Sequence, residues 1–315
     1  MKKILVTGAL GQIGSELVGK LRNLYGTEGV IATDILKRTS SEVASGPYEA
    51  LDVTNGLAMF DIANKYGVDT IIHLAALLSA TSEEKPVQAW QLNIGGLMNA
   101  LEVSRSLGCQ LFTPSSIAAF GPTTTKDHTP QETIQRPNSM YGVSKVAGEL
   151  LCDYYYHKFG LDTRGLRFPG LISYVTLPGG GTTDYVVEMY IQAVARGKYT
   201  SYLSPGTFLD MMYMPDALDA IISIMEADGS KLKHRNAFNV SAMSIDPEML
   251  AEAIRKHIPA FKVDYKPDPL RQAIADSWPN AIDSSASIEQ WGFQVNYDLD
   301  QMTVEMLSHL AVKGN

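Results

Sequence analysis

The sequence is poor in the residues that mark secreted, metal-binding and nucleic-acid-binding proteins. Only 2 of its 315 residues are cysteine, Cys109 and Cys152, and they lie far apart in no metal-binding spacing. Such cysteines are typical of reduced thiols in a cytosolic protein, and we expect no metal site. The formal net charge is -8, and no long cluster of Lys and Arg is present. We therefore expect neither nucleic acid nor an anionic membrane as a partner.

Long apolar runs are missing as well. A membrane-spanning helix needs about 20 consecutive apolar residues, and no run in this sequence comes near that length. The opening stretch MKKILVTGALG reaches Gly8 too early to contain the apolar core of a signal peptide. We therefore expect a cytoplasmic protein. Its composition, 45% hydrophobic and 19% charged, is ordinary for a globular chain.

The first half of the chain alternates short apolar strands with helical patterns, among them a long helix over 140–159. This alternation predicts an α/β fold with a doubly wound, Rossmann-like parallel sheet. We expect 1–169, with a returning segment near 207–227, to form that domain. The rhythm breaks after residue 169. We therefore expect 170–206 and 228–315 to form a smaller C-terminal substrate lobe, with AFNVS and KVDYKPD as two of its short strands.

The turn after the first strand carries the first sign of a ligand. Gly8, Gly11 and Gly14 lie directly after a strand and open a helix. Glycines let the backbone approach a pyrophosphate, and the helix N-terminus supplies N–H donors to it. Asp34 ends the second strand about 20 residues further on, where a carboxylate accepts the ribose hydroxyls of NAD and repels the 2′-phosphate of NADP. Because Lys37 and Arg38 follow closely, NADP stays open as an alternative.

Other predicted cofactor contacts follow from the same topology, because ligands of such sheets bind at the carboxyl ends of the strands. Asp52 and Val53 end the third predicted strand and suit a contact with adenine. The segment after the fourth strand is small and apolar, which suits backbone contact with the cofactor. His73, just before it, has no second metal ligand nearby and is expected to pack at the strand end. The contacts predicted at this point are Gly8, Gly11, Gln12, Ile13, Gly14, Asp34, Asp52, Val53, Leu74, Ala75 and Ala76.

A tyrosine and a lysine four residues apart are the candidate catalytic pair. Tyr141 and Lys145 in YGVSK share one face of the predicted helix, and an ammonium beside a tyrosine stabilises its phenolate. The tyrosine then becomes a usable general base. This spacing alone is common on exposed helices. However, Ser115 and Ser116 end the preceding strand, so the Ser116 hydroxyl is expected to meet Tyr141 and Lys145 at the cofactor.

The motifs GALGQIG, HLAA, PSSIAAFG and YGVSK occur in this order along the chain. Together they resemble the extended branch of the short-chain dehydrogenase/reductase superfamily, which includes UDP-galactose 4-epimerase. The resemblance implies that NAD is the cofactor and that Tyr141 and Lys145 also contact it. It adds Asn93, in QLNIGG, and Pro169 to the predicted cofactor contacts.

Two later segments, RFPGLISYVTLPGGGTTDYVVEMY and SWPNAIDSSAS, resemble the epimerase-like L-threonine 3-dehydrogenases. That family often has threonine where this chain has Ser116, and serine keeps the hydroxyl. The resemblance implies oxidation of the β-hydroxyl of L-threonine by NAD⁺ to 2-amino-3-oxobutyrate. It also implies a homodimer built on two helices per subunit, one of them carrying Tyr141. The implied substrate contacts are Ser79, Ser115, Ser116, Tyr141, Thr182, Thr183 and Trp278.

Several of these roles have simpler alternatives. Thr182 and Thr183 are also suited to capping a helix that starts near Asp184, and Trp278 is equally suited to the core. The three glycines Gly179–Gly181 predict either a surface turn or the hinge of a loop that closes over a small substrate.

Two other functions also fit the motifs. A nucleotide-sugar epimerase or dehydratase would share the fold and the Tyr/Lys pair but needs cations for two phosphates, and Arg136, Arg235 and Arg271 are scattered. A non-catalytic NAD-binding protein is disfavoured because the predicted serine, tyrosine and lysine are all retained.

Overall fold

The computed structural model describes residues 1–36, 42–176, 179 and 181–313. It confirms the predicted fold class. Six parallel strands form the main sheet in the order β3-β2-β1-β4-β5-β7. The direction of winding reverses between β1 and β4, which is where sheets of this kind bind ligands. The strands are β1 (Ile4–Thr7), β2 (Val30–Asp34), β3 (Tyr48–Ala50), β4 (Thr70–His73), β5 (Gln110–Phe112) and β7 (Thr163–Arg164).

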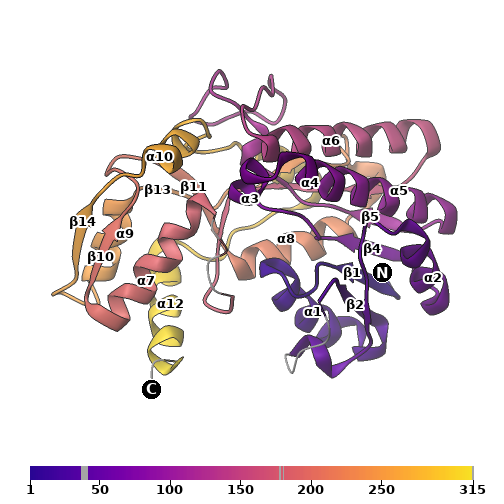
Figure 1. The fold of residues 1–315 in the computed structure, drawn as a ribbon, viewed down its shortest axis with the longest axis horizontal. Coiled ribbons are helices and arrows are strands. Elements are labelled where there is room, and N and C mark those ends of the chain that lie inside the picture. Colours follow the sequence, from indigo (N-terminus) through magenta and orange to yellow (C-terminus); the bar gives the residue numbers. More distant parts are fainter. Residues whose placement is uncertain (37–41, 177–178, 180, 314–315) are drawn as a thin grey trace.

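Helices cover both faces of this sheet, as Figure 1 shows. One face packs against α2 (Gly56–Tyr66), α5 (Gly96–Leu107) and α6 (Met140–Phe159). The other face packs against α1 (Gln12–Tyr25) and α8 (Met214–Glu226). Because helices cover both faces of the sheet, β1 and β4 are buried along their whole length. Their residues are apolar or carry a hydroxyl, except for His73 at the end of β4.

Short strands extend the layer toward the smaller lobe. One ladder joins β6 (Ser115–Ser116), β8 (Leu166–Phe168) and β12 (Phe238–Asn239), and another joins β9 (Gly170–Ile172), β11 (Leu209–Tyr213) and β13 (Met243–Ile245). The expectation that AFNVS belongs to the smaller lobe is wrong, because β12 pairs in parallel with β8. Phe238 and Val240 are fully buried in the core beneath α8, and that burial attaches this segment to the main layer.

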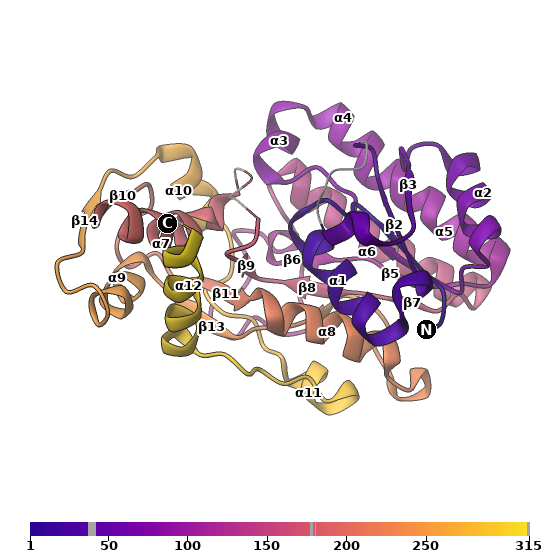
Figure 2. The ribbon, with the colours of Figure 1, turned by 90° about the horizontal axis from the view of Figure 1, so that it is seen from below.

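A second apolar cluster, built around Tyr185, Tyr190 and Met302, lies beyond these ladders. Figure 2 shows its elements gathered at the far end from the N-terminus. The elements of this cluster are α7 (Tyr185–Arg196), β10 (Lys198–Ser201), α9 (Pro247–Arg255), β14 (Lys262–Tyr265), α10 (Pro269–Asp276) and α12 (Leu299–Lys313). Helix α11 (Ser285–Trp291) lies nearer the main sheet. The domain boundaries themselves stay a prediction.

Two short helices, α3 (Ser79–Glu84) and α4 (Pro86–Trp90), follow β4 and pack beside α6. Within the described ranges, no helix is both long and apolar enough to cross a membrane.

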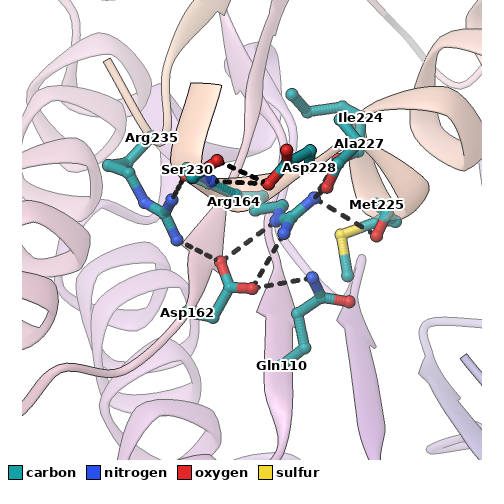
Figure 3. Close-up of polar contacts among 10 residues, drawn as sticks. Gln110, Asp162, Arg164, Ile224, Met225, Ala227, Asp228, Ser230 and Arg235 are labelled. Carbon is teal, nitrogen blue, oxygen red and sulfur yellow. Dashed lines mark hydrogen bonds and ion pairs between the residues drawn. The ribbon is translucent and has the colours of Figure 1, made fainter. Parts of the chain in front are cut away.

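An ion cluster fastens α8 to the main sheet (Figure 3). Arg164 of β7 donates to the carbonyl oxygens of Ile224 at 2.5 Å and Ala227 at 2.7 Å, at the C-terminus of α8. A cation at this position also balances the helix dipole. Asp162 binds Arg164 at 2.9 Å and Arg235 at 2.6 Å. Burial alone would raise the pKa of Asp162, but the hydrogen bonds and charge of Arg164 outweigh it and hold that pKa below its usual range.

We predict that Asp162→Asn lowers the free energy of unfolding at pH 7 by about 1–3 kcal/mol, because it leaves two largely buried guanidinium groups without a counter-charge. Urea unfolding measures the change. The difference in the free energy of unfolding between wild type and Asp162→Asn should be largest above the ordinary carboxyl pKa near 4. It should disappear as the pH falls through the depressed pKa that Asp162 has in the folded state. Asp228→Asn, at an exposed carboxylate of the same cluster, is the control. An equal loss in both variants would contradict a particular role for Asp162.

Candidate active site

Three cavities meet at the segment that follows β4, and Leu74 and Ala76 line all three. This segment lies at the carboxyl ends of the parallel strands, beside the reversal between β1 and β4. The position is the one that doubly wound sheets use for ligands. The three cavities therefore mark the candidate site.

The glycine-turn cavity is lined by Gly8, Gly11, Asp34, Ile35, Leu51, Asp52, Val53, Leu74–Leu77 and Leu92. Gly8 has φ +68°, and a Cβ there would lie 2.7 Å from Ala75 N. A Cβ on Gly14 would lie 2.3 Å from Gly8 O. Both positions therefore require glycine. Among the described residues no side chain caps the N-terminus of α1, so its first N–H groups can receive an anion such as a pyrophosphate.

Asp34 is held at the end of β2 by two backbone N–H groups. Its carboxylate accepts from Leu10 N at 3.1 Å and from Leu36 N at 3.2 Å. This fixes the carboxylate at the wall of the glycine-turn cavity while leaving it lone pairs for a ribose hydroxyl. Lys37 and Arg38 lie outside the described residues.

Asp52 and Val53 lie just past β3. The Asp52 carboxylate accepts from Thr54 N at 2.9 Å, and Val53 is buried against Gly96. Together with the glycine turn and Asp34, this cavity fits the adenosine and pyrophosphate part of a dinucleotide.

The tyrosine cavity brings the predicted catalytic residues together. Ser116, Tyr141 and Lys145 all line it. Lys145 Nζ lies 5.2 Å from the centre of the Tyr141 ring and donates to Pro114 O at 2.7 Å. Ser116 Oγ accepts from Ala118 N at 3.2 Å, in the turn after β6. The convergence predicted from YGVSK and the strand-end serine is therefore present, and the roles of the three groups stay predictions.

Gly142 explains how α6 comes so close to the serine. A Cβ at this position would lie 2.2 Å from Ala118 O and 2.6 Å from Pro137 Cβ. The backbone of α6 therefore packs directly on the turn that carries Ser116. Only glycine permits this contact without displacing one of the two elements.

Ser115 also lines the tyrosine cavity and donates its hydroxyl to Glu149. Glu149 also accepts from Nε and Nη2 of Arg167, at 2.9 and 2.8 Å, and from Gln135 Nε2 at 2.9 Å. Glu149 and Arg167 are buried and were missed in the sequence. The signal was present for Glu149, which lies four residues after Lys145 and so on the same face of α6.

The predicted substrate contacts Ser79, Thr182, Thr183 and Trp278 line the same tyrosine cavity, as do Gln12, Ile13 and Pro169. The capping alternative for the threonines is not observed in the described part of the chain. The N-cap of α7 is Asp184, whose carboxylate accepts from Gly181 N at 2.7 Å. Trp278 belongs to the second apolar cluster and lines the cavity as well. Gly180, the centre of the predicted hinge, lies outside the described residues, so the closing loop stays a prediction.

The third cavity, called the rear cavity, also reaches Lys145 and is lined by His73, Asn93 and Glu149, among others. His73 Nδ1 lies 2.9 Å from Thr7 Oγ1. Burial, and then the charge of Lys145, lowers the pKa of His73 to about 4, so it is neutral at pH 7. Asn93 bonds both backbone groups of Leu77, at 2.8 and 3.1 Å. In the part of the chain that the structure describes, no group of three or more His, Cys, Asp or Glu could hold a metal ion.

The wall that carries Trp278 is held by a buried carboxylate on β11. Asp210 accepts from Ile282 N and from Ser241 Oγ, each at 2.8 Å, and is fully buried. Burial raises the pKa of Asp210 to about 7, although these hydrogen bonds oppose the rise. Asp210 thus ties the chain just after Trp278 to the strand next to β9.

Comparison with known proteins identifies the group to which this site belongs. The model of the NAD dependent epimerase/dehydratase family matches residues 4–241. The chain belongs to this family. Membership confirms the extended dehydrogenase/reductase branch predicted from the four motifs, and with it NAD as the cofactor. The glycine turn and Asp34 fit that cofactor.

Several proteins are similar to this chain over nearly its whole length. A solved L-threonine dehydrogenase from Clostridium difficile is 60% identical, covers 100% of this chain and 99% of its own, and superposes with a TM-score of 0.98. The holo form of a GalE-like L-threonine dehydrogenase from Cupriavidus necator is 45% identical, covers 98% and 99%, and has a TM-score of 0.95. A curated relative from Staphylococcus saprophyticus, an uncharacterized epimerase/dehydratase, is 60% identical over 315 residues, with 100% and 98% covered.

We predict that Asp210→Asn removes a pH-dependent part of the stability of this family member. A raised folded-state pKa means that the native state binds the proton more tightly than the unfolded state. The contribution of Asp210 is therefore full below the unfolded pKa near 4 and is lost as the pH rises through about 7. Wild type should lose stability relative to the variant as the pH rises from about 4 to about 7, as measured by urea unfolding at each pH. Parallel pH profiles for the two proteins would contradict this.

Proposed function

We propose that this chain is an NAD-dependent L-threonine 3-dehydrogenase, which oxidises the β-hydroxyl of L-threonine to give 2-amino-3-oxobutyrate. The observation that carries the proposal is the match of the whole chain, at 60% identity and a TM-score of 0.98, to the L-threonine dehydrogenase of Clostridium difficile. The tyrosine cavity supports it with a phenol, an ammonium and a serine hydroxyl along one wall.

Each of these side chains has a chemical task in the proposed reaction. Tyr141, as phenolate, takes the proton of the substrate hydroxyl. The Lys145 ammonium beside the ring stabilises the phenolate and is oriented by Pro114 O. The Ser116 hydroxyl donates to the reacting oxygen and keeps it near the phenol. When bound, NAD⁺ supplies the hydride acceptor at this position.

The tyrosine cavity is also suited to a small zwitterion. Hydroxyls of Ser79, Thr182 and Thr183 can donate to a carboxylate, and Asp184 supplies an acceptor for an ammonium. Apolar side chains on the same wall, among them Ile117 and Leu171, suit the methyl group of threonine.

The nucleotide-sugar alternative finds less support in the same cavity. Among the described lining residues, Lys145 is the only cation, whereas a sugar nucleotide carries two phosphates. Two of the three candidate arginines have other partners. Arg235 binds Asp162, and Arg271 stacks 4.2 Å from the centre of the Tyr202 ring.

The proposal includes a cytoplasmic homodimer. Cys109 and Cys152 are both buried free thiols, which suits a reducing compartment. Val143, Leu150 and Tyr154 are exposed along one face of α6, the helix that carries Tyr141. An apolar stripe of this kind suits pairing with the same stripe of a second subunit.

Purified protein should form NADH from NAD⁺ and L-threonine, followed by its absorbance. Tyr141→Phe keeps the ring and removes the base, so turnover should fall by about 10²-fold or more while NAD binding persists. Tyr154→Phe, an exposed tyrosine on the same helix, is the control and should keep full activity. Substantial activity in Tyr141→Phe would assign the proton to another group. No NADH from threonine, with turnover of a nucleotide sugar, would favour the epimerase.

Tyr154→Glu should convert the proposed dimer into a monomer, since it places a charge in the apolar stripe. Light scattering after size-exclusion chromatography measures the mass, and Val304→Glu, an exposed valine on α12, serves as control. A wild-type protein that elutes as a monomer would reject the dimer.

A further inference from the structure

The first turn of α6 is held by two acceptors from different parts of the chain. Ser139 Oγ, at the N-cap, accepts from Gly142 N at 3.1 Å. A second acceptor comes from α3, where Glu83 Oε1 accepts from Met140 N at 2.6 Å. The first N–H groups of a helix have no partner within it, so such acceptors decide whether the turn is formed or frayed. Tyr141, the proposed base, lies between these two bonded amides.

The helix that supplies Glu83 also reaches the tyrosine cavity. Ser79, the first residue of α3, lines that cavity. Ser79 and Glu83 are four residues apart and so lie on the same face of α3. One short helix therefore contacts both the cavity and the turn that carries the phenol.

A second tie between the same elements lies at the other end of α3. Asn93 holds the backbone of Leu77, just before α3, and its Nδ2 reaches Ser144 Oγ of α6 at 3.4 Å. The Asn93 tie lies just before α3 and the Glu83 bond lies near its end, so both ends of α3 are connected to α6.

We infer that Glu83 is a positioning residue for the proposed reaction: by bonding Met140 N it fixes the Tyr141 phenol relative to the substrate wall of α3. The inference rests on the proposed function. Its physical reason is the sensitivity of proton and hydride transfer to placement, where a shift of about 1 Å costs up to about 10²-fold in rate. Glu83 itself is exposed and does not line the tyrosine cavity, so it acts only through α6.

The test compares two changes at this carboxylate. Glu83→Ala removes the acceptor, and we expect kcat on L-threonine to fall about tenfold while the affinity for NAD is unchanged. Glu83→Gln keeps an acceptor oxygen and loses only the charge, so it should stay within about threefold of wild type. Glu84→Ala, at the neighbouring exposed carboxylate, is the matched control and should equal wild type.

A primary isotope effect separates positioning from simple loss of folded protein. With L-threonine deuterated at the β-carbon, the isotope effect on kcat should be larger in Glu83→Ala than in wild type, because the chemical step becomes slower. A smaller fraction of active enzyme would lower kcat and leave the isotope effect unchanged. Wild-type activity in Glu83→Ala, or a Gln variant as impaired as the Ala variant, would overturn the inference while the proposed function stands.

Amide hydrogen exchange tests the same contact without substrate. Exchange at residues 140–142 should be faster in Glu83→Ala than in wild type and unchanged in Glu84→Ala. If wild type failed to oxidise threonine, the proposed function would fall, and this measurement would still decide whether Glu83 holds the turn. Equal exchange in all three proteins would reject the contact.

Discussion

The contact between the backbone of α6 and the turn after β6 is the one on which the site depends. With no side chain at Gly142, the helix lies directly on Ala118 O, where a Cβ would come within 2.2 Å. This approach puts Tyr141 and Lys145 along the same cavity as Ser116. Lys145 then reaches Pro114 O, the carbonyl just ahead of the serine pair. One missing side chain thus brings a strand end and a helix start within reach of the same small molecule.

The buried charges around this contact orient neighbouring side chains more than they stabilise the fold. In a buried ion pair such as that of Glu149 and Arg167, the cost of desolvating the two charges offsets much of their Coulomb attraction. The pair instead fixes orientation, because Glu149 accepts from the Ser115 hydroxyl and from Nε and Nη2 of Arg167. Asp210 acts in the same way on the wall of Trp278, and there the cost is visible as a carboxyl pKa raised to about 7.

Much of the frame could be predicted from local patterns. The periodicity of 140–159 predicts a helix, and α6 spans Met140–Phe159. Glycine spacing after a strand predicts a dinucleotide turn, and Gly8 and Gly14 allow no Cβ there. The pattern of AFNVS also predicts a strand correctly, but its expected partner is wrong, since β12 pairs with β8 rather than within the smaller lobe. The residue pattern of a strand indicates which of its faces are buried. It does not indicate which neighbouring strand it pairs with.

The sequence by itself determined which chemical groups share one element. Tyr141 and Lys145 are four residues apart on a helix, and Asp34 ends the strand that follows the glycine turn. Only the tertiary structure decided which distant groups meet them. Glu83 binds Met140 across 57 residues, Arg167 binds Glu149 across 18, and Asp210 binds Ile282 across 72. Periodicity fixes neighbours within a helix or strand, because backbone geometry repeats there. Contacts between elements depend on how whole faces pack, and no local spacing encodes that.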